Sequence, residues 1–246
     1  MLTGEDKKRH GRRLETQINQ AAPGKWKGHK LRAAASVTVV SLNPWLRNWV
    51  GCAHPPKTDR AWLERTAEDY LYMLRHAPVF HDPLGAFSAR RQAFWYYPDG
   101  AWLQRIVQET FNVWHFGQYN FLDRMVRRRD PVAIAVCLGR FAEGAMRLSM
   151  LLARDYTPHW KWLAAEFRKL PDIEQMDVGL RDLFASHDID AQADLVRKIN
   201  DRIHTQWVDR FDLSPDPRDH PHPLFCAKNE LAEKANGEWM DIRRRR

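Results

Sequence analysis

Apolar residues recur every three or four positions along most of the chain, as they do in amphipathic helices. The pattern is strongest from Asp59 onward, and it predicts helices over 59–76, 87–95, 99–127, 130–156, 160–170, 173–186 and 191–207. Asp59, Asp99 and Asp130 stand where helices begin, because a carboxylate there accepts hydrogen bonds from free backbone N–H groups. We therefore expect a helical bundle from Asp59 onward.

The first fifty residues follow a different pattern. Residues 5–22 predict an exposed helix, and Val37–Ser41 is short and β-branched, as in a strand. A further helix is expected to begin at Asn43 and to end at Gly51. The predicted fold class is mainly α, a helical bundle preceded by the remnant of a small mixed α/β sheet.

The predicted helix over 130–156 carries small residues at spacings that let a neighbouring helix approach closely, namely Ala135, Gly139 and Ala142. Most of its other positions are apolar. We therefore expect this helix to lie at the centre of the bundle.

The net charge of +8 invites a nucleic-acid interpretation, so its distribution matters. Residues 1–32 hold nine Lys and Arg against three Asp and Glu, and Arg243–Arg246 add four more positive charges. The remaining residues, 33–242, hold 26 basic and 28 acidic groups. Because a domain that grips phosphates carries its positive stripe on the folded body, we expect no specific nucleic-acid site.

Composition also bears on the compartment. The longest nearly apolar run, Val132–Gly139, is far shorter than the roughly 18 residues of a membrane span, and the N-terminal residues lack the apolar stretch of a secretory signal. The three cysteines, Cys52, Cys137 and Cys226, are widely spaced and form neither a disulfide framework nor a zinc motif. We expect a soluble cytoplasmic protein that does not associate with membranes.

Common catalytic and phosphate-binding motifs are absent from the sequence, including G-x-x-x-x-G-K-[ST], G-x-G-x-x-G, G-x-S-x-G and H-E-x-x-H. The single D-x-D, Asp188-Ile-Asp190, lies between two predicted helices, and we interpret Asp190 as the N-cap of the second. His220 and His222 stand among prolines, which favours a solvated loop over a metal site.

Two weaker patterns suggest other chemistry. Arg154-x4-His159 and Arg197-x6-His204 match the spacing of helical ribonucleases, so RNA cleavage by Arg197 and His204 is one hypothesis. Tryptophans can also serve as stacking platforms for bases. The spacing of the eleven tryptophans, as in Trp160 and Trp162, favours a role in the core instead.

An ordered series of motifs is more specific than any of these patterns. The series comprises Val79-Phe-His-Asp82-Pro-Leu-Gly85, Arg90, Tyr96-Tyr97-Pro98-Asp99, Gly117-Gln-Tyr-Asn120, Arg124, Arg154-Asp-Tyr156, Pro158 and Lys161-Trp162. Over about residues 37–170 the chain resembles a domain-of-unknown-function family, the helical C-terminal half of nucleotidyltransferase-like (kanamycin-nucleotidyltransferase-like) proteins. The resemblance implies a small mixed sheet followed by a helical bundle.

The resemblance also implies a catalytic apparatus, in which a Gly-Ser turn holds nucleotide phosphates and strand carboxylates bind magnesium. This sequence has no Gly-Ser dipeptide, and its D-x-D, at residues 188–190, lies beyond the stretch that resembles the family. Residues 2–6 are similar to those that follow the family's catalytic aspartates. We therefore expect a chain that begins after its active site, lacks catalytic competence and holds no cofactor. Magnesium and a nucleoside triphosphate would bind only with a complete core.

The resemblance divides the chain into the remnant of a nucleotidyltransferase-like core (1–52), a helical bundle domain (53–210) and an irregular, weakly helical tail (211–246). The candidate substrate-binding residues are the polar positions of the matched motifs: Asp82, Arg90, Gln118, Asn120, Arg124, Arg154, Tyr156 and Lys161. Arg and Lys suit phosphates or anionic acceptors, and amides suit base or sugar edges. For each residue a structural role is an equal alternative, and no catalytic or metal-binding residue is expected.

The leading hypothesis is thus a helical part of a nucleotidyltransferase-like protein that contacts a nucleotide or a small-molecule acceptor. The alternative is a non-catalytic interaction module that binds a protein partner, or a second copy of itself, through an exposed apolar face.

Overall fold

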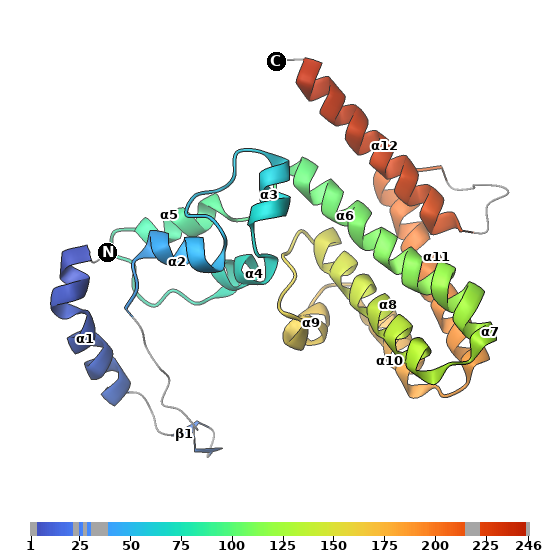
Figure 1. Ribbon diagram of the computed structural model, residues 1–246, viewed down its shortest axis with the longest axis horizontal. Helices are drawn as coiled ribbons and strands as arrows, with labels where there is room; N and C mark the ends of the chain where they lie inside the picture. Colours follow the sequence, from blue (N-terminus) through green and yellow to red (C-terminus); the bar gives the residue numbers. More distant parts are fainter. Residues whose placement is uncertain (1–3, 22–24, 27–28, 31–38, 215–221, 245–246) are drawn as a thin grey trace. The chain divides into compact units, whose positions relative to one another are not determined.

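The computed structural model describes residues 4–21, 25–26, 29–30, 39–214 and 222–244 of the 246-residue chain. The described part is mainly helical, as expected (Figure 1). Two compact units can be distinguished, unit 1 with Met1–Lys57 and Glu64–Trp95, and unit 2 with Thr58–Leu63 and Tyr96–Arg246. The three domains expected from the sequence (1–52, 53–210 and 211–246) have other boundaries than these two units, and that division stays a prediction.

Unit 1 holds the first helices and both strands of the described chain. They are α1 (Gly4–Ala21), β1 (Lys25–Trp26), β2 (His29–Lys30), α2 (Leu42–Trp49), the end of α3 (Asp59–Arg65), α4 (Glu68–His76) and α5 (Ala86–Ala93). The strands β1 and β2 pair antiparallel over two residues each.

The strand expected over Val37–Ser41 is not found. Residues 39–41 have no regular secondary structure, and 37–38 lie outside the described residues. The Val39 N–H donates to the Glu15 carboxylate at 2.7 Å, so a side chain takes the place that a neighbouring strand would have. The helical part of the predicted fold class is therefore confirmed, whereas a sheet remnant is not shown.

The single helix expected over 59–76 is two helices, α3 and α4, because tertiary contacts break it. The Ala67 N–H donates to the Val50 carbonyl at 3.0 Å instead of continuing the helix. Gly51, at φ 97°, lies so close to α3 that a Cβ would stand 1.8 Å from the Arg65 carbonyl oxygen. The preceding helix, α2, begins after Ser41 rather than at Asn43.

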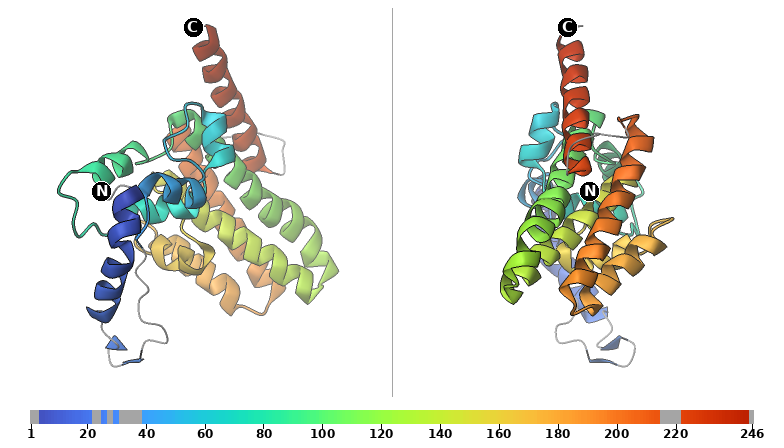
Figure 2. Two further views of the ribbon diagram at one scale, coloured as in Figure 1. Left: turned by 60° about the vertical axis from the view of Figure 1, so that its left-hand side comes forward. Right: turned by 90° about the vertical axis from the view of Figure 1, so that its right-hand side faces the viewer.

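Unit 2 is a bundle of longer helices (Figures 1 and 2). They are α6 (Asp99–Trp114), η1 (His115–Met125), α7 (Val126–Arg128), α8 (Pro131–Leu152), α9 (Trp160–Phe167), α10 (Glu174–Ala185), α11 (Ile189–Phe211) and α12 (Pro223–Arg244). α6 packs along α8 and α12, while α11 packs on α10, α12 and η1. The core holds fully buried side chains of these helices, such as Ile106, Phe121, Phe141, Leu148, Val196 and Trp207.

Aspartates begin two helices of unit 2. Asp130 caps α8, accepting from the Val132 N–H at 2.9 Å and the Ala133 N–H at 3.0 Å. At α11 the N-cap is Asp188, whose carboxylate accepts from the Asp190 N–H at 2.9 Å. The expectation that Asp190 is the cap is therefore wrong by two residues, because α11 begins at Ile189.

The long helix expected over 99–127 is found, with the π-helix η1 inside it. Side chains bond to three carbonyls of its wide turns: Asn120 Nδ2 donates to His115 at 2.8 Å, Cys137 Sγ donates to Phe116 at 2.9 Å, and Arg124 donates to Tyr119. Such contacts stabilise the wider turn, which leaves some carbonyls without the usual helical partner.

The helix α8 is exposed only over its first turns and along one face. Val132 is 72% exposed and Val136 is 60% exposed, but Leu138, Phe141 and Leu148 are buried. Among the described residues no heavy atom lies within 4 Å of a Cβ built on Gly139. The close helix approach expected at Ala135 and Gly139 is therefore not found in this part of the structure.

No helix, over the residues that could be searched, is both long and apolar enough to cross a membrane.

Candidate functional site

The two candidate residues of unit 1 hold its own backbone. The Asp82 carboxylate accepts from the Ser88 N–H at 2.8 Å and from the Phe87 N–H at 3.4 Å, at the start of α5. These bonds, first of all those from Ser88, keep the pKa of Asp82 below its usual value. Arg90 donates to the Asn43 side chain at 3.0 Å and to the Ala53 carbonyl, which ties α5 to the segment around α2.

Three candidates lie on η1. Asn120 and Arg124 bond to the helix's own carbonyls, and the Arg124 guanidinium also stacks on the Tyr119 ring at 3.6 Å. Gln118 is 8% exposed, and its Oε1 atom is buried with no hydrogen-bond partner in the described structure. Asn120 and Arg124 thus have structural duties, whereas Gln118 is a buried amide with unused acceptor capacity.

The candidates at the end of α8 surround an aromatic cluster. Arg154 stands just after this helix at φ 56°, pairs with Asp99 Oδ1 at 2.7 Å, and stacks over the Trp102 ring at 3.4 Å. Tyr156 is fully buried, and its ring lies about 5 Å from those of Tyr96 and Tyr97. Arg154 is therefore a cation held firmly in place, and Tyr156 belongs to the core.

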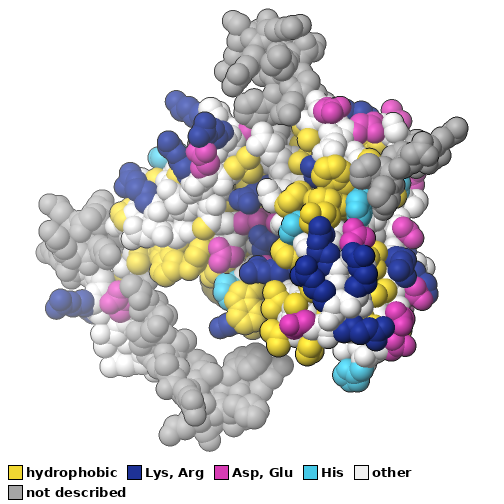
Figure 3. All heavy atoms as spheres, turned by 45° about the vertical axis from the view of Figure 1, so that its right-hand side comes forward, with side chains coloured by type: hydrophobic (Ala, Val, Ile, Leu, Met, Phe, Trp, Pro, Cys, Tyr) yellow, Lys and Arg dark blue, Asp and Glu magenta, His cyan; other side chains and the backbone are white. Residues whose placement is uncertain are grey.

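The segment around Lys161 corrects an expectation from the sequence. Trp160 is 67% exposed and Trp162 is 63% exposed, so the interpretation of this tryptophan pair as core is wrong. Both belong to the first turn of α9, where His159 caps the helix through its Nδ1 atom and the Lys161 ammonium lies 5.8 Å from the Trp160 ring. Exposed hydrophobic side chains are not confined to this helix: Figure 3 shows others on the surface, between basic and acidic side chains.

The pair proposed for RNA cleavage does not share an environment. Arg197 is exposed and bonds to Asp194 at 2.8 Å. His204 Nε2 is buried with no partner among the described residues, and burial lowers the pKa of this imidazole. A general acid for RNA cleavage needs an accessible nitrogen that carries a proton near neutral pH, so the arrangement does not favour this activity.

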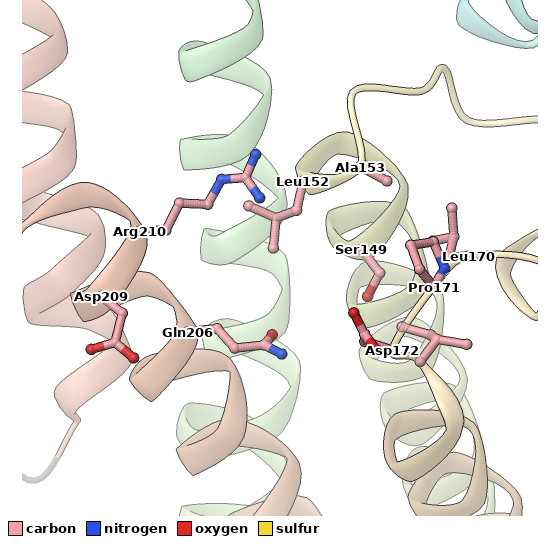
Figure 4. Close-up of a pocket in the computed structure, with 10 residues that line it drawn as sticks. Ser149, Leu152, Ala153, Leu170, Pro171, Asp172, Gln206, Asp209 and Arg210 are labelled. Carbon is pink, nitrogen blue, oxygen red and sulfur yellow. The ribbon is translucent and has the colours of Figure 1, made fainter.

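A pocket that sequence reasoning missed lies within unit 2, between the end of α8, the loop before α10, and the last turns of α11 (Figure 4). Its volume is about 500 Å³, within the range of small-molecule sites. Polar and apolar groups both line it: Ser149, Leu152, Ala153, Leu170, Pro171, Asp172, Ile173, Gln206, Asp209 and Arg210. The polar groups can contact a ligand that carries both hydrogen-bonding and charged groups.

The most distinctive charge in this pocket is the Arg210 guanidinium. It lies 5.9 Å from the Trp102 ring, on which Arg154 also stacks. Burial, and next the positive charge of Arg154, lower the pKa of Arg210, while the Tyr96 hydroxyl acts in the opposite direction. Within the described ranges Arg210 forms no ion pair with a carboxylate. Of the residues predicted from the sequence, Arg154 is thus the one that acts on the pocket. It does not line the pocket, but its charge acts on Arg210, which does.

The other pocket-lining polar residues had no sequence signal. Ser149, Asp172 and Gln206 come from three separate segments, and none of them belongs to a motif. Arg210 stands in the last turn of α11, where a basic residue is ordinarily explained by the helix dipole.

The thiols are poorly suited to catalysis. Burial raises the pKa of Cys137 to about 11, and burial also raises the pKa of Cys52 and of Cys226. Since the thiolate is the reactive form, these cysteines are weak nucleophiles at neutral pH. No group of three His, Cys, Asp or Glu side chains that could hold a metal ion is present among the residues that the structure describes.

Comparison with known proteins gives one match. Residues 62–163 match the model of a protein family described as "Domain of unknown function (DUF4037)". All eight candidate residues, from Asp82 to Lys161, lie inside this range. No curated protein and no solved structure matches the chain.

Proposed function

We propose that this chain is the helical C-terminal part of a nucleotidyltransferase-like protein and that the pocket between α8, α10 and α11 binds its small-molecule substrate. The observation that carries the proposal is the polar lining of this pocket, in which a guanidinium, an amide, a hydroxyl and two carboxylates come together from α8, α11 and the loop before α10. A few placed polar groups in a concave, partly apolar site are typical of substrate recognition. The ordered motifs around the matched domain at residues 62–163 support the link to nucleotidyltransferases.

Saturation-transfer NMR with a panel of sugars, amino sugars, sugar phosphates and nucleotides tests the pocket. Ala153 lines the pocket and is exposed, so Ala153→Trp fills the space without removing a buried contact. The matched control is Ala135→Trp, an exposed position of the same helix α8. We expect panel compounds to bind the wild-type chain and the control but not Ala153→Trp. Binding that Ala153→Trp leaves unchanged would contradict the proposal.

We further propose that the 246-residue chain alone does not transfer nucleotides, because it has neither a Gly-Ser dipeptide nor a D-x-D before the bundle. The resembled enzymes need such groups to hold the triphosphate and magnesium. Incubation with each nucleoside triphosphate, magnesium and the panel compounds that bind should leave the triphosphate intact. Magnesium-dependent turnover would overturn this part of the proposal.

An apolar pocket in unit 1 favours the second candidate, a protein-interaction module. It has a volume of about 360 Å³ and is lined by Val40, Leu42, Trp45, Met73, Leu74, Ala77 and Phe87. Met73 is 54% exposed there. If the module associates with itself, sedimentation velocity should show a concentration-dependent dimer that Met73→Glu abolishes. A monomer at every concentration would count against self-association.

A further inference from the structure

Arg210 is a positive charge that the described part of the protein leaves uncompensated. The charged and polar groups that act on it are the Arg154 guanidinium and the Tyr96 hydroxyl, and no carboxylate is among them. The Asp99 carboxylate is bonded to Arg154 instead, at 2.7 Å. Arg210 is exposed, so its guanidinium is open to an anion from solvent, which the nearby positive charge of Arg154 would also attract.

Arg154 cannot easily turn away from Arg210. Its guanidinium stacks on the Trp102 ring at 3.4 Å, and Trp102 is itself fixed by a hydrogen bond from its Nε1 atom to the Leu151 carbonyl at 2.7 Å. The two guanidinium groups, at 3.4 Å and 5.9 Å from the same ring, are therefore held near one another by the fold. Figure 4 shows Arg210 extending from α11 toward Leu152 of α8, at one end of the pocket.

Away from Arg210 the pocket is lined by Gln206, Ser149 and Asp172 (Figure 4). Their amide, hydroxyl and carboxylate oxygens accept hydrogen bonds from hydroxyl groups. A second carboxylate, that of Asp209, stands on the same side as Arg210, on α11. These carboxylates would repel a compound that carried negative charge along its whole length. The pocket is thus matched to a ligand with an anionic group at one end and hydroxyl groups along its body.

We propose that the pocket selects a phosphate monoester of a polyol or sugar, with its phosphate on Arg210 and its hydroxyl groups toward Gln206 and Asp172. A guanidinium binds phosphate through two parallel N–H donors, which gives both charge and direction. Arg154 adds a second positive charge, weakened by its pairing with Asp99. This inference rests on the proposed function, because it names the substrate class of the same pocket.

The test compares glucose 6-phosphate, glucose and inorganic phosphate by calorimetry and by ligand-observed NMR. The variant is Arg210→Gln, with Arg210→Lys to separate charge from packing on Trp102, and circular dichroism to confirm folding. The control is Arg197→Gln, which removes an exposed arginine of the same helix that pairs with Asp194. We expect the wild-type chain to bind glucose 6-phosphate at least about tenfold more tightly than glucose.

Arg210→Gln should abolish this preference, Arg210→Lys should retain part of it, and Arg197→Gln should leave it unchanged. Equal binding of glucose and glucose 6-phosphate, no binding of either phosphate compound, or a preference that survives Arg210→Gln would each overturn the inference. The proposed function fails separately, when Ala153→Trp does not affect the panel compounds that bind. If Ala153→Trp abolishes binding but the pocket shows no preference for the phosphate compound, the inference is wrong and the proposed function still holds.

Discussion

At the scale of single residues, Glu109 shows how unit 2 holds a charge away from water. Its side chain is 8% exposed, and it accepts from Arg147 Nε at 3.1 Å and from Asn112 Nδ2 at 2.9 Å. Arg147, on α8, is a quarter exposed and lies 3.9 Å from Glu143 as well. The Glu109 carboxylate therefore links α6 and α8, since it accepts from one side chain of each helix.

Glu109→Ala should lower the free energy of unfolding by about 2 kcal/mol, because Arg147 Nε and Asn112 Nδ2 both lose a partly buried charged acceptor. The partial exposure of Arg147 keeps the loss below that of a fully buried pair. The control is Asp194→Ala, whose exposed pair with Arg197 should contribute within about 0.5 kcal/mol. Urea unfolding checks both, and equal effects of the two variants would contradict this account.

His204 makes stability depend on pH. Burial lowers the pKa of His204 in the folded chain, so the unfolded chain binds more protons between that lowered pKa and the ordinary value near 6.5. Stability should therefore fall as pH drops through about 6.5, and His204→Gln should flatten this slope. Thermal unfolding between pH 5 and pH 8, with the exposed His187→Gln as the control, measures it. If the pH dependence of stability is unchanged in His204→Gln, groups other than His204 cause it.

At the scale of elements, η1 depends on a close approach that only glycine permits. A Cβ on Gly117 would lie 2.7 Å from the buried Phe141 ring and 3.0 Å from Asn200 Nδ2. Phe141 is fully buried and has no room to move aside. The wide turn is thus stabilised both by side chains that bond to its carbonyls and by the packing of its glycine against α8 and α11.

Gly117→Ala should lower the free energy of unfolding by about 2 kcal/mol, as overpacking in a core does. Gly139→Ala is the matched control, since it lies on exposed helix surface with no described neighbour within 4 Å of its Cβ. This control should gain up to about 1 kcal/mol from helix propensity. Stability changes of the same sign for both variants would show that the packing at η1 is looser than described.

The helices that could be predicted from the sequence are those whose formation depends on residues close together in the chain. The periodic pattern is enough for α6, α8 and α10, and Asp130 caps α8 where expected. The break between α3 and α4 could not be predicted, because it depends on contacts with Val50 and Gly51. Nor could η1, because its wide turns rest on Cys137 and Phe141 from another helix.

At the scale of the whole molecule, the same reasoning explains why the pocket escaped prediction. Its lining comes from residues 149–153, 170–173 and 206–210, which tertiary packing alone brings together. Sequence motifs pointed instead to side chains such as Arg90 and Asn120, which bond to nearby backbone carbonyls. Arg154 is the candidate that both approaches share, since it lies in a motif and acts on Arg210.

The central claim is that the pocket of unit 2 is where a small molecule binds. Hydrogen–deuterium exchange, recorded with and without the tightest-binding panel compound, tests it most directly. A compound bound in this pocket should slow exchange only in residues 149–154, 170–173 and 206–210, the segments that line or adjoin the pocket. Protection that leaves these segments unchanged and appears elsewhere, for example on η1 or in unit 1, would contradict it.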